Sequence, residues 1–309
     1  MVQPLFTKDG TAQGVAKQRF IESLAPHGQR VIFDPDAKNF IAGSHFIRLM
    51  GHKLNLWLST KLAPGMHEHL IARTRFIDEL VTRCAAEGIE QYVILGAGYD
   101  LRAHRLSLPT ELAVFEVDQE EVQVRKRSKL PEARASQSRP TYVSVDFSSQ
   151  SLSQRLLESG FDQTKSTLFT LEGVSQYVSK EALKKTLSEL KILSAKPNTV
   201  FFVSYVDERV NTDPAACCGE GYPEPHKKLA LIQKLSAMAG ESWQSFYSRT
   251  EFNALLANAG FAITEEKTLA DLNDEYFAPA NRLIPQSNLL KLERLIVGKN
   301  TNMTCREIT

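Results

Sequence analysis

The sequence predicts an α/β fold in which a mostly parallel sheet is covered by helices on both faces. Three features support this prediction: β-prone apolar runs alternate with amphipathic segments from residue 91 onward, one run leads into a glycine turn, and the next run ends in an acid. Alternation of this kind indicates a parallel sheet, because neighbouring parallel strands must be joined by a crossover, which is usually a helix.

About 90 residues of helical character precede the first predicted strand. Apolar residues recur at a spacing of three to four in Gly14–Leu24, in the segment after Pro35, and in Met66–Ala86, and Pro64 marks a break before the last of these segments. We expect residues 1–90 to form a helical lid that caps a ligand pocket.

Five β-prone runs alternate with three helical segments in the next part of the chain. The predicted strands are Gln91–Leu95, Ala113–Asp118, Tyr142–Asp146, Thr167–Leu171 and Val200–Val206. The predicted helices between them are Glu120–Leu130, Leu152–Ser159 and Glu181–Ala195. We expect residues 91–309 to form a second unit that contains this sheet.

The alternation is interrupted at residues 208–250. This segment holds the pair Cys217-Cys218, an amphipathic helix, His226–Ala239, and the aromatic residues Trp243, Phe246 and Tyr247. A helix at Glu251–Ala259 and strands at Phe261–Lys267 and Arg294–Val297 are predicted to follow. We expect the insertion and the N-terminal helices to wall a pocket, since open α/β sheets bind ligands at the carboxyl ends of their strands.

The run Tyr92–Arg102 (YVILGAGYDLR) joins the first strand to the turn Gly96, Ala97 and Gly98. Glycine suits a nucleotide-binding turn because it adopts backbone angles closed to other residues and lets a cofactor lie against the main chain. A dinucleotide fold requires a third glycine at position 101, where this chain has Leu101. An adenosine cofactor other than NAD is therefore favoured.

The second predicted strand ends at Asp118, 22 residues after Gly96. A carboxylate at this spacing can accept hydrogen bonds from both ribose hydroxyls of an adenosine. The spacing fits NAD equally well, so an NAD(P)-dependent oxidoreductase and a non-catalytic adenosine-binding protein remain alternatives. Glu116 shares the strand face with Asp118 and is expected to be structural.

Five motifs occur together in a characteristic order. They are Arg73–Asp78 (RTRFID), GAGYDLR, Phe115–Asp118 (FEVD), Val145–Phe147 (VDF), and Leu171–Gly173 (LEG) followed by Tyr177. In this order the chain, from about Gly14 to about Lys299, resembles the leucine carboxyl methyltransferase family. This family is a branch of the class I S-adenosylmethionine-dependent methyltransferases that includes bacterial and polyketide carboxyl O-methyltransferases.

The resemblance implies a Rossmann-like sheet of seven strands, mostly parallel, that ends in an antiparallel pair and binds S-adenosylmethionine within residues 91–309. It also implies that Arg73 pairs with the methionine carboxylate of the cofactor and that Glu172 lies beside the methionyl portion. Asp146 would hold the adenine amino group, and Phe147 would offer its backbone N–H to the ring. With Gly96, Ala97, Gly98 and Asp118, these residues form the expected cofactor site.

Each assignment has a structural alternative. Arg73 could be a solvated helix residue like its neighbour Arg75, and Asp146 could be a helix N-cap. Lys17 and Arg19 lie near a further basic position of the family but are expected to be surface charges. Asp100 and Arg102 are expected to pair with each other and shape the loop.

The resemblance implies methyl transfer to a carboxylate of a small molecule or peptide. A carboxylate is ionised at neutral pH and needs no general base, so no catalytic residue is required. A phenol, amine or thiol acceptor is the alternative. A phenol or alcohol would need a base, for which Tyr177, Tyr205, His226 and His67 are the candidates.

Composition adds exclusions. The 37 basic and 36 acidic residues give a net charge of +1, which argues against a nucleic-acid or membrane surface. The N-terminus lacks an apolar signal region, so we expect a cytoplasmic protein with reduced cysteines (Cys84, Cys217, Cys218, Cys305) and no disulfide. His67 and His69 would point to different faces of a helix, so no metal site is expected.

Overall fold

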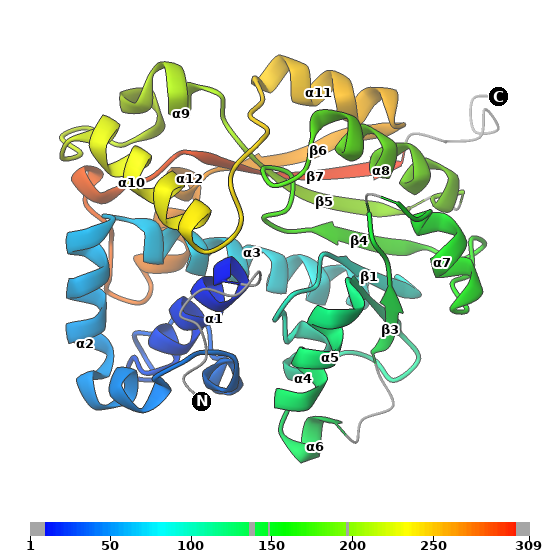
Figure 1. Cartoon of the computed structure of the whole chain (residues 1–309), viewed down its shortest axis with the longest axis horizontal. Helices are drawn as coiled ribbons and strands as arrows, with labels where there is room; N and C mark the ends of the chain where they lie inside the picture. Colours follow the sequence, from blue (N-terminus) through cyan, green and yellow to red (C-terminus); the bar gives the residue numbers. More distant parts are fainter. Residues whose placement is uncertain (1–9, 136–139, 148, 196–197, 301–309) are drawn as a thin grey trace.

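The computed structural model describes residues 10–135, 140–147, 149–195 and 198–300 (Figure 1). Seven strands form one sheet in the order β3-β2-β1-β4-β5-β7-β6. The first five are parallel to one another, whereas β7 runs antiparallel to both β5 and β6. The predicted fold class is therefore confirmed.

The strands match the β-prone runs of the sequence closely. They are β1 (Gln91–Leu95), β2 (Ala113–Asp118), β3 (Thr141–Ser144), β4 (Thr167–Leu171), β5 (Val200–Val206), β6 (Phe261–Lys267) and β7 (Glu293–Asn300). Two strands differ from the prediction at both ends. β3 begins one residue before Tyr142 and stops at Ser144, and β7 begins one residue before Arg294 and continues to Asn300.

Helices connect the strands and extend beyond them. The α-helices are α1 (Gly10–Ser23), α2 (Ser44–Leu62), α3 (Met66–Ala86), α4 (Arg102–Arg105), α5 (Glu120–Lys129), α6 (Glu132–Ala135), α7 (Leu152–Glu158), α8 (Lys180–Leu193), α9 (Arg209–Thr212), α10 (Pro225–Met238), α11 (Arg249–Asn258) and α12 (Leu269–Leu272). Short 3-10 helices occur at Pro35–Phe40 (η1), Pro214–Cys217 (η2) and Gln286–Asn288 (η4), and a π-helical turn at Asn273–Phe277 (η3). Serine side chains cap α7, α8 and α11 by accepting a backbone N–H of the first turn.

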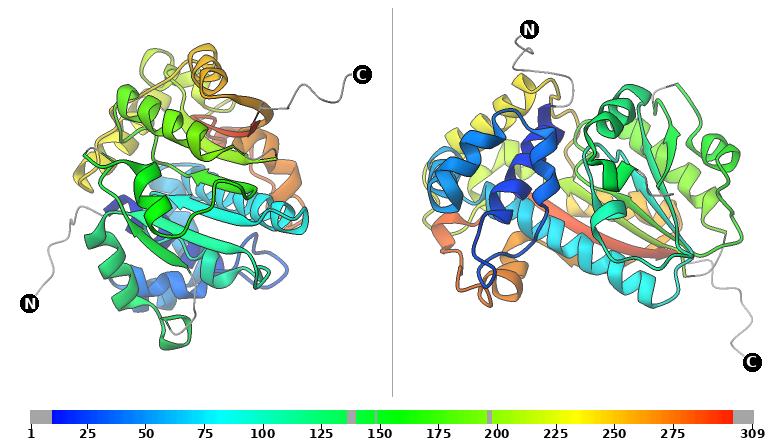
Figure 2. Two further views of the ribbon diagram at one scale, coloured as in Figure 1. Left: turned by 90° about the vertical axis from the view of Figure 1, so that its right-hand side faces the viewer. Right: turned by 90° about the horizontal axis from the view of Figure 1, so that it is seen from below.

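Strand alternation divides the core into two layers (Figure 2). Tyr92 and Ile94 of β1 face α3, whereas Val93 and Leu95 face α7 and α8. The helices follow the same logic, since Leu183, Leu187, Leu190 and Leu193 of α8 recur at three-to-four spacing and are all buried. α3 thus covers the sheet, although it belongs to the helical segment expected to form the lid.

A third, smaller core joins the N-terminal helices to the glycine turn. Phe20 of α1 and Phe40 of η1 pack with Tyr99 and Leu101, and the rings of Phe40 and Tyr99 stack at 4.7 Å. α1 also meets the end of α10, because a Cβ added at Gly10 would lie 2.6 Å from the carbonyl oxygen of Ala239. We call α1, η1, α2 and residues 208–250 the cap (Figure 1).

Cys84, Cys217 and Cys218 are free thiols, as expected. The last two are buried rather than exposed in a loop, and burial raises the pKa of Cys217 to about 12 and that of Cys218 to about 11. Cys305 lies outside the described residues. None of the described helices is both long and apolar enough to cross a membrane.

Candidate functional site

The glycine turn after β1 has a backbone that other residues cannot readily adopt. Gly96 has φ of +65°, and a Cβ there would lie only 2.6 Å from a methyl carbon of Val174. Gly98 has φ of +44° and lines the same cavity as Ala97. An added side chain would therefore be strained, and the bare backbone leaves room for a ligand.

Asp118 fixes this turn from the neighbouring strand. Its Oδ2 accepts the Gly98 N–H at 2.6 Å, and its Oδ1 accepts the Gln119 N–H at 2.7 Å. Burial raises the pKa of Asp118, although both backbone hydrogen bonds oppose this effect. A carboxylate offers about four acceptor positions, so two of them remain for ligand hydroxyls.

Arg73 of α3 points into the molecule and Arg75 points out. The Nε of Arg73 donates to Glu172 at 2.9 Å, and its Nη1 donates to Glu293 at 2.8 Å. Arg75 is exposed and pairs with Glu79. Burial alone would lower the pKa of Arg73, but Glu293 and Glu172 raise it above its ordinary value. Arg73 is thus a buried, charge-paired residue and no solvated helix residue.

Arg102 supplies a second guanidinium to Glu172. Its Nη1 donates to Glu172 at 2.6 Å and to Asp100 at 2.5 Å, which confirms the expected pairing of Asp100 with Arg102. Its Nε donates to Asp78 at 2.7 Å. Burial raises the pKa of Glu172, but Arg102 and Arg73 outweigh this and hold it below its usual range. Glu172 therefore remains a carboxylate at the end of β4.

These elements surround a cavity of about 890 Å³. It lies at the carboxyl ends of β1 and β4, where the strand order reverses direction and open α/β sheets bind ligands. Seven of the eight expected cofactor residues line it: Arg73, Gly96, Ala97, Gly98, Asp118, Phe147 and Glu172. Asp146 is exposed outside the lining, where it accepts the Ser149 hydroxyl at 2.8 Å.

The four candidate bases lie in different surroundings. His67 lines the cavity, with its ring nitrogens next to Gln18 and Glu22. Tyr177 lines the cavity and receives a hydrogen bond from Ser236 at 3.3 Å. Tyr205 is fully buried against Phe252, with ring centroids 4.0 Å apart, and lies outside the cavity lining. His226 is exposed on α10 and does not line the cavity either. Of the four, the structure thus brings Tyr177 and His67 to the site.

The aromatic residues of the insertion also separate. Trp243 lines the cavity, whereas Phe246 and Tyr247 pack into the two main cores. The three rings thus divide between the pocket, for Trp243, and the core, for Phe246 and Tyr247. This segment is irregular and has no periodic pattern of burial. The sequence therefore does not show which of the three rings faces the cavity.

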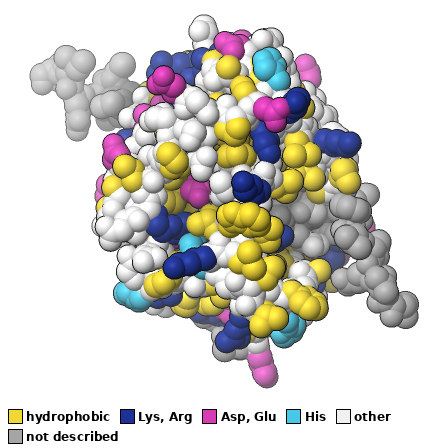
Figure 3. Space-filling view, turned by 90° about the vertical axis from the view of Figure 1, so that its left-hand side faces the viewer, with side chains coloured by type: hydrophobic (Ala, Val, Ile, Leu, Met, Phe, Trp, Pro, Cys, Tyr) yellow, Lys and Arg dark blue, Asp and Glu magenta, His cyan; other side chains and the backbone are white. Residues whose placement is uncertain are grey.

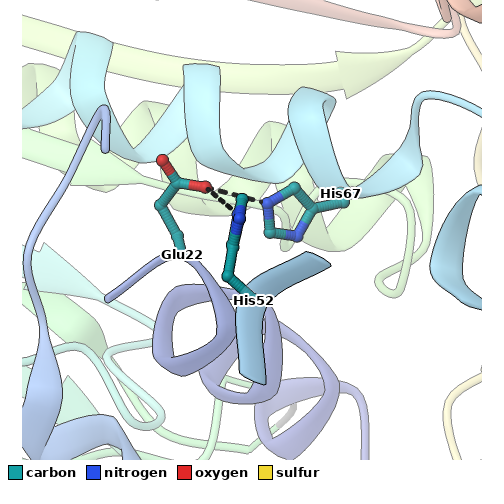
Figure 4. Close-up of side chains that lie close together, drawn as sticks. All are labelled: Glu22, His52 and His67. Atoms are coloured by element: carbon teal, nitrogen blue, oxygen red, sulfur yellow. Dashed lines mark hydrogen bonds and ion pairs between the residues drawn. The ribbon is translucent and has the colours of Figure 1, made fainter. Parts of the chain in front are cut away.

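A buried cluster that sequence reasoning missed joins three helices of the N-terminal region (Figure 4). The Oε2 atom of Glu22 in α1 lies 3.0 Å from Nε2 of His67 in α3, within hydrogen-bond distance. The same oxygen lies 3.6 Å from Nε2 of His52 in α2. The three ligand-type atoms lie within 4.8 Å of one another, a spacing that a metal ion could share. However, the other oxygen of Glu22 already binds Arg282 at 2.7 Å and the Val31 N–H at 2.7 Å.

We therefore read this cluster as a fastening of the N-terminal helices. Burial alone would raise the pKa of Glu22, but the neighbouring His52 and His67 rings and the Arg282 cation hold it far below its usual range. The charge of Glu22 is balanced by Arg282, so no additional cation is required. From the sequence, only His67 and His69 on one helix were weighed as metal ligands. The sequence does not show that three helices meet at Glu22.

Of three further polar residues, one lies in surroundings that differ from the prediction. Arg19 is buried and pairs with Asp34 at 3.0 Å, so its expectation as a surface charge is wrong. Lys17 is exposed at the cavity rim. Glu116 is buried and pairs with Lys126 at 2.6 Å, which confirms its structural role, and burial raises its pKa to about 7.

Sequence analysis did not predict the role of Glu293 or its contact with His69. Glu293 begins β7 and accepts both Arg73 and His69, the latter at 2.5 Å. The only sequence signal is an acid at the start of a strand with an apolar centre, Leu295–Val297. Since a buried acid must be paired, that signal predicts a partner without identifying it.

Comparisons with known proteins agree with this geometry. A model of the leucine carboxyl methyltransferase family matches residues 12–191. A Bacillus subtilis protein described as "Putative S-adenosyl-L-methionine-dependent methyltransferase YktD" is 31% identical over 67% of this chain and 66% of its own length. A relative from Mycolicibacterium gilvum, described as "Putative S-adenosyl-L-methionine-dependent methyltransferase", is 33% identical over 89% of this chain and 87% of its own length.

Solved structures share the fold. A crystal structure of a methyltransferase from Thermobifida fusca, described there as putative, has a TM-score of 0.54 at 15% identity and covers 92% of this chain and 94% of its own. A Streptomyces avermitilis protein has a TM-score of 0.55 at 14% identity, over 79% and 88% of the two chains. The chain belongs to the leucine carboxyl methyltransferase family, and it is an S-adenosylmethionine-dependent methyltransferase with a class I fold.

Proposed function

We propose that this enzyme methylates a carboxylate oxygen of a small molecule or peptide. The observation that supports this most is the state of the basic groups at the cavity. Burial raises the pKa of Tyr177, which makes its phenol a hydrogen-bond donor and a poor base. Both ring nitrogens of His67 are occupied, by Gln18 and by Glu22. A carboxylate acceptor requires neither group to remove a proton.

We further propose that the cofactor lies on the glycine turn. Its ribose would bind Asp118, its methionine carboxylate would bind Arg73, and its ammonium would bind Glu172. The fit is supported by the bare backbone at Gly96 and Gly98 and by the exposed edge of Glu172, whose side chain is 15% exposed. When bound, the cofactor supplies an activated sulfonium methyl. The chain then has to orient the acceptor and exclude water.

Asp146 is the one expected cofactor residue that does not line the cavity. Its carboxylate is on the surface at the start of the turn after β3, beside Phe147, which does line the cavity. We propose that the backbone N–H of Phe147 contacts the adenine ring and that the Asp146 carboxylate accepts a hydrogen bond from the adenine amino group. Asp146→Ala should lower cofactor affinity if the proposal is correct and should only loosen the turn if it is not.

We propose that the cap holds the acceptor. Apolar side chains from three parts of the cap line the cavity, among them Met50 and Leu58 of α2, Ile232 and Leu235 of α10, and Trp243. Such a lining favours an acid with an apolar body over a free amino acid. The expected division into a lid at residues 1–90 and a catalytic domain at 91–309 stays a proposal, with α3 serving both parts.

The reaction can be tested directly. The enzyme is incubated with S-adenosylmethionine labelled in the methyl group and an extract of metabolites, and the labelled product is treated with mild alkali. A methyl ester should release labelled methanol. A label that resists alkali contradicts the carboxylate proposal and assigns the acceptor to the alternative class of phenols, amines or thiols.

A further inference from the structure

Helix α2 exposes an unusual number of large apolar side chains. Half of the exposed large apolar residues in the described part of the chain belong to this one helix. They are Phe46, Leu49, Met50, Leu54, Trp57, Leu58 and Leu62, with exposed fractions from 36% to 85%. We call these residues the α2 apolar face. A contiguous exposed patch of this kind marks a binding surface, whereas single exposed apolar residues do not.

The exposure is not a sign of a poorly attached helix. The opposite side of α2 is buried through Ile47, His52 and Asn55. Gly51 interrupts the helix with φ of +67°, and the side-chain amide of Asn55 binds the carbonyl oxygens of Ile47 and Gly51 at 2.8 and 2.7 Å. The break is thus stabilised by a specific contact, and the helix is fixed with its apolar face outward.

The charge of α2 has a single sign. The helix carries Arg48, Lys53 and Lys61, all exposed, and it contains no Asp or Glu. Lys228 of α10 adds a fourth cation at its end, where it donates to the carbonyl oxygens of Lys61 and Leu62. Figure 3 shows this side of the molecule, with apolar side chains gathered among Lys and Arg. The whole-chain charge of +1 conceals this local excess.

We propose that the α2 apolar face docks on an anionic lipid surface. Exposed Phe, Trp and Leu beside Lys and Arg are typical of helices that lie in the headgroup region, where apolar side chains enter the acyl boundary and cations meet lipid phosphates. A second copy of the chain is the weaker occupant. A twofold contact through α2 would face Arg48, Lys53 and Lys61 with the same cations, and α2 has no acid to pair with them.

The docking surface also reaches the cavity. Met50, Leu58 and Leu62 belong both to the α2 apolar face and to the cavity lining. A docked enzyme would therefore present its cavity to the lipid, and an apolar acid could enter without crossing water. This last step rests on the proposed acceptor, whereas the docking itself does not.

The test uses the full chain and vesicles of two compositions: phosphatidylcholine alone, and phosphatidylcholine mixed with phosphatidylglycerol. We expect co-sedimentation with the anionic vesicles, weakened by salt. The chain has two tryptophans, so Trp243→Phe leaves Trp57 as the only reporter, and its emission should shift to the blue on binding. Equal binding to both vesicles, or binding to neither, overturns the proposal.

Variants separate the contributions. Leu49→Ser with Leu54→Ser should lower vesicle affinity about tenfold or more, and Lys53→Gln should lower it roughly fivefold. Ile192→Ser is the matched control, because Ile192 is 61% exposed on α8, away from the cap, and its loss should change nothing. Circular dichroism and S-adenosylhomocysteine binding verify the fold of each variant. A dimer that the leucine variants abolish, without vesicle binding, would assign the face to a second copy instead.

Discussion

The two sides of the cavity are built by different kinds of contact. On the cofactor side, a strand, a glycine turn and the next strand's acid are close in sequence, and their geometry follows from local backbone rules. On the cap side, α1, α2 and α3 are fastened by Glu22 and its partners from distant segments. The comparison teaches that the glycine turn and Asp118 follow from local sequence signals, whereas the cap and the contacts of Arg73 depend on residues far apart in the sequence.

The largest effect should come from Arg73→Ala, which removes the cation between two buried acids. Leaving Glu172 and Glu293 without this partner should lower the free energy of unfolding by about 3–5 kcal/mol. Cofactor affinity should fall about ten- to a hundredfold in the fraction that folds. Urea unfolding and calorimetric titration with S-adenosylhomocysteine measure the two effects.

Arg75→Ala is the matched control for this experiment, because Arg75 carries the same charge two residues away on the exposed side of α3. Its effect on stability should stay below about 1 kcal/mol. Unchanged affinity in Arg73→Ala would remove Arg73 from the cofactor site. A large loss in Arg75→Ala alone would show that the wrong arginine was chosen.

The next effect is a loss of stability in acid. The Arg73 guanidinium and His69 outweigh burial and hold the pKa of Glu293 at about 2, below its ordinary value of 4.5. As the pH falls from 4.5 to 2, the unfolded chain therefore binds a proton that the folded chain does not. The contribution of Glu293, roughly 3 kcal/mol, is present above pH 4.5 and is lost across this window.

Thermal unfolding as a function of pH measures this loss. Glu293→Gln should flatten the curve between pH 4.5 and 2 relative to the parent protein, while lowering stability at neutral pH. Equal acid slopes for both proteins would mean that Glu293 contributes little to acid sensitivity and that Glu22 and Glu172, whose pKa values are also lowered, dominate it.

The smallest effect concerns the cap. Glu22→Gln keeps the shape of the side chain but removes the charge that balances Arg282, so stability should fall by about 1–3 kcal/mol. Cofactor affinity should hardly change, because Glu22 does not line the cavity. EDTA should leave the melting temperature of the parent protein unaltered. A lower melting temperature in EDTA would instead show that a metal ion occupies the cluster.

The sequence predicted the sheet well because its signals are local. Apolar runs give the strand ends within one or two residues, except that β7 continues three residues beyond Val297. The turn after β1 is recognised from Gly96 and Gly98 alone. β3 ended earlier than its apolar run, because strand length depends on the partner strand. This difference leaves Asp146 at the surface instead of at a strand end.

The site was predicted less completely, because periodicity shows that a side chain is buried without naming its neighbour. Arg73 was selected correctly as the inward arginine, yet its contact with Glu293 joins residues 220 positions apart. Tyr205 was weighed as a base although β5 is buried on both faces, which places its ring in the core. The convergence of Glu22, His52 and His67 likewise exists only in three dimensions.

Leu101 carries a consequence for how this enzyme could evolve. The residue occupies the position where a dinucleotide-binding turn would have its third glycine, and it is buried with Phe20 and Phe40 in the core that joins α1 to the turn. Replacing it with glycine would leave a hole in that core and cost about 3–5 kcal/mol by analogy with other buried leucine truncations. A single substitution at this position is therefore not expected to change the cofactor class. The N-terminal segments that pack on Leu101 would have to change as well.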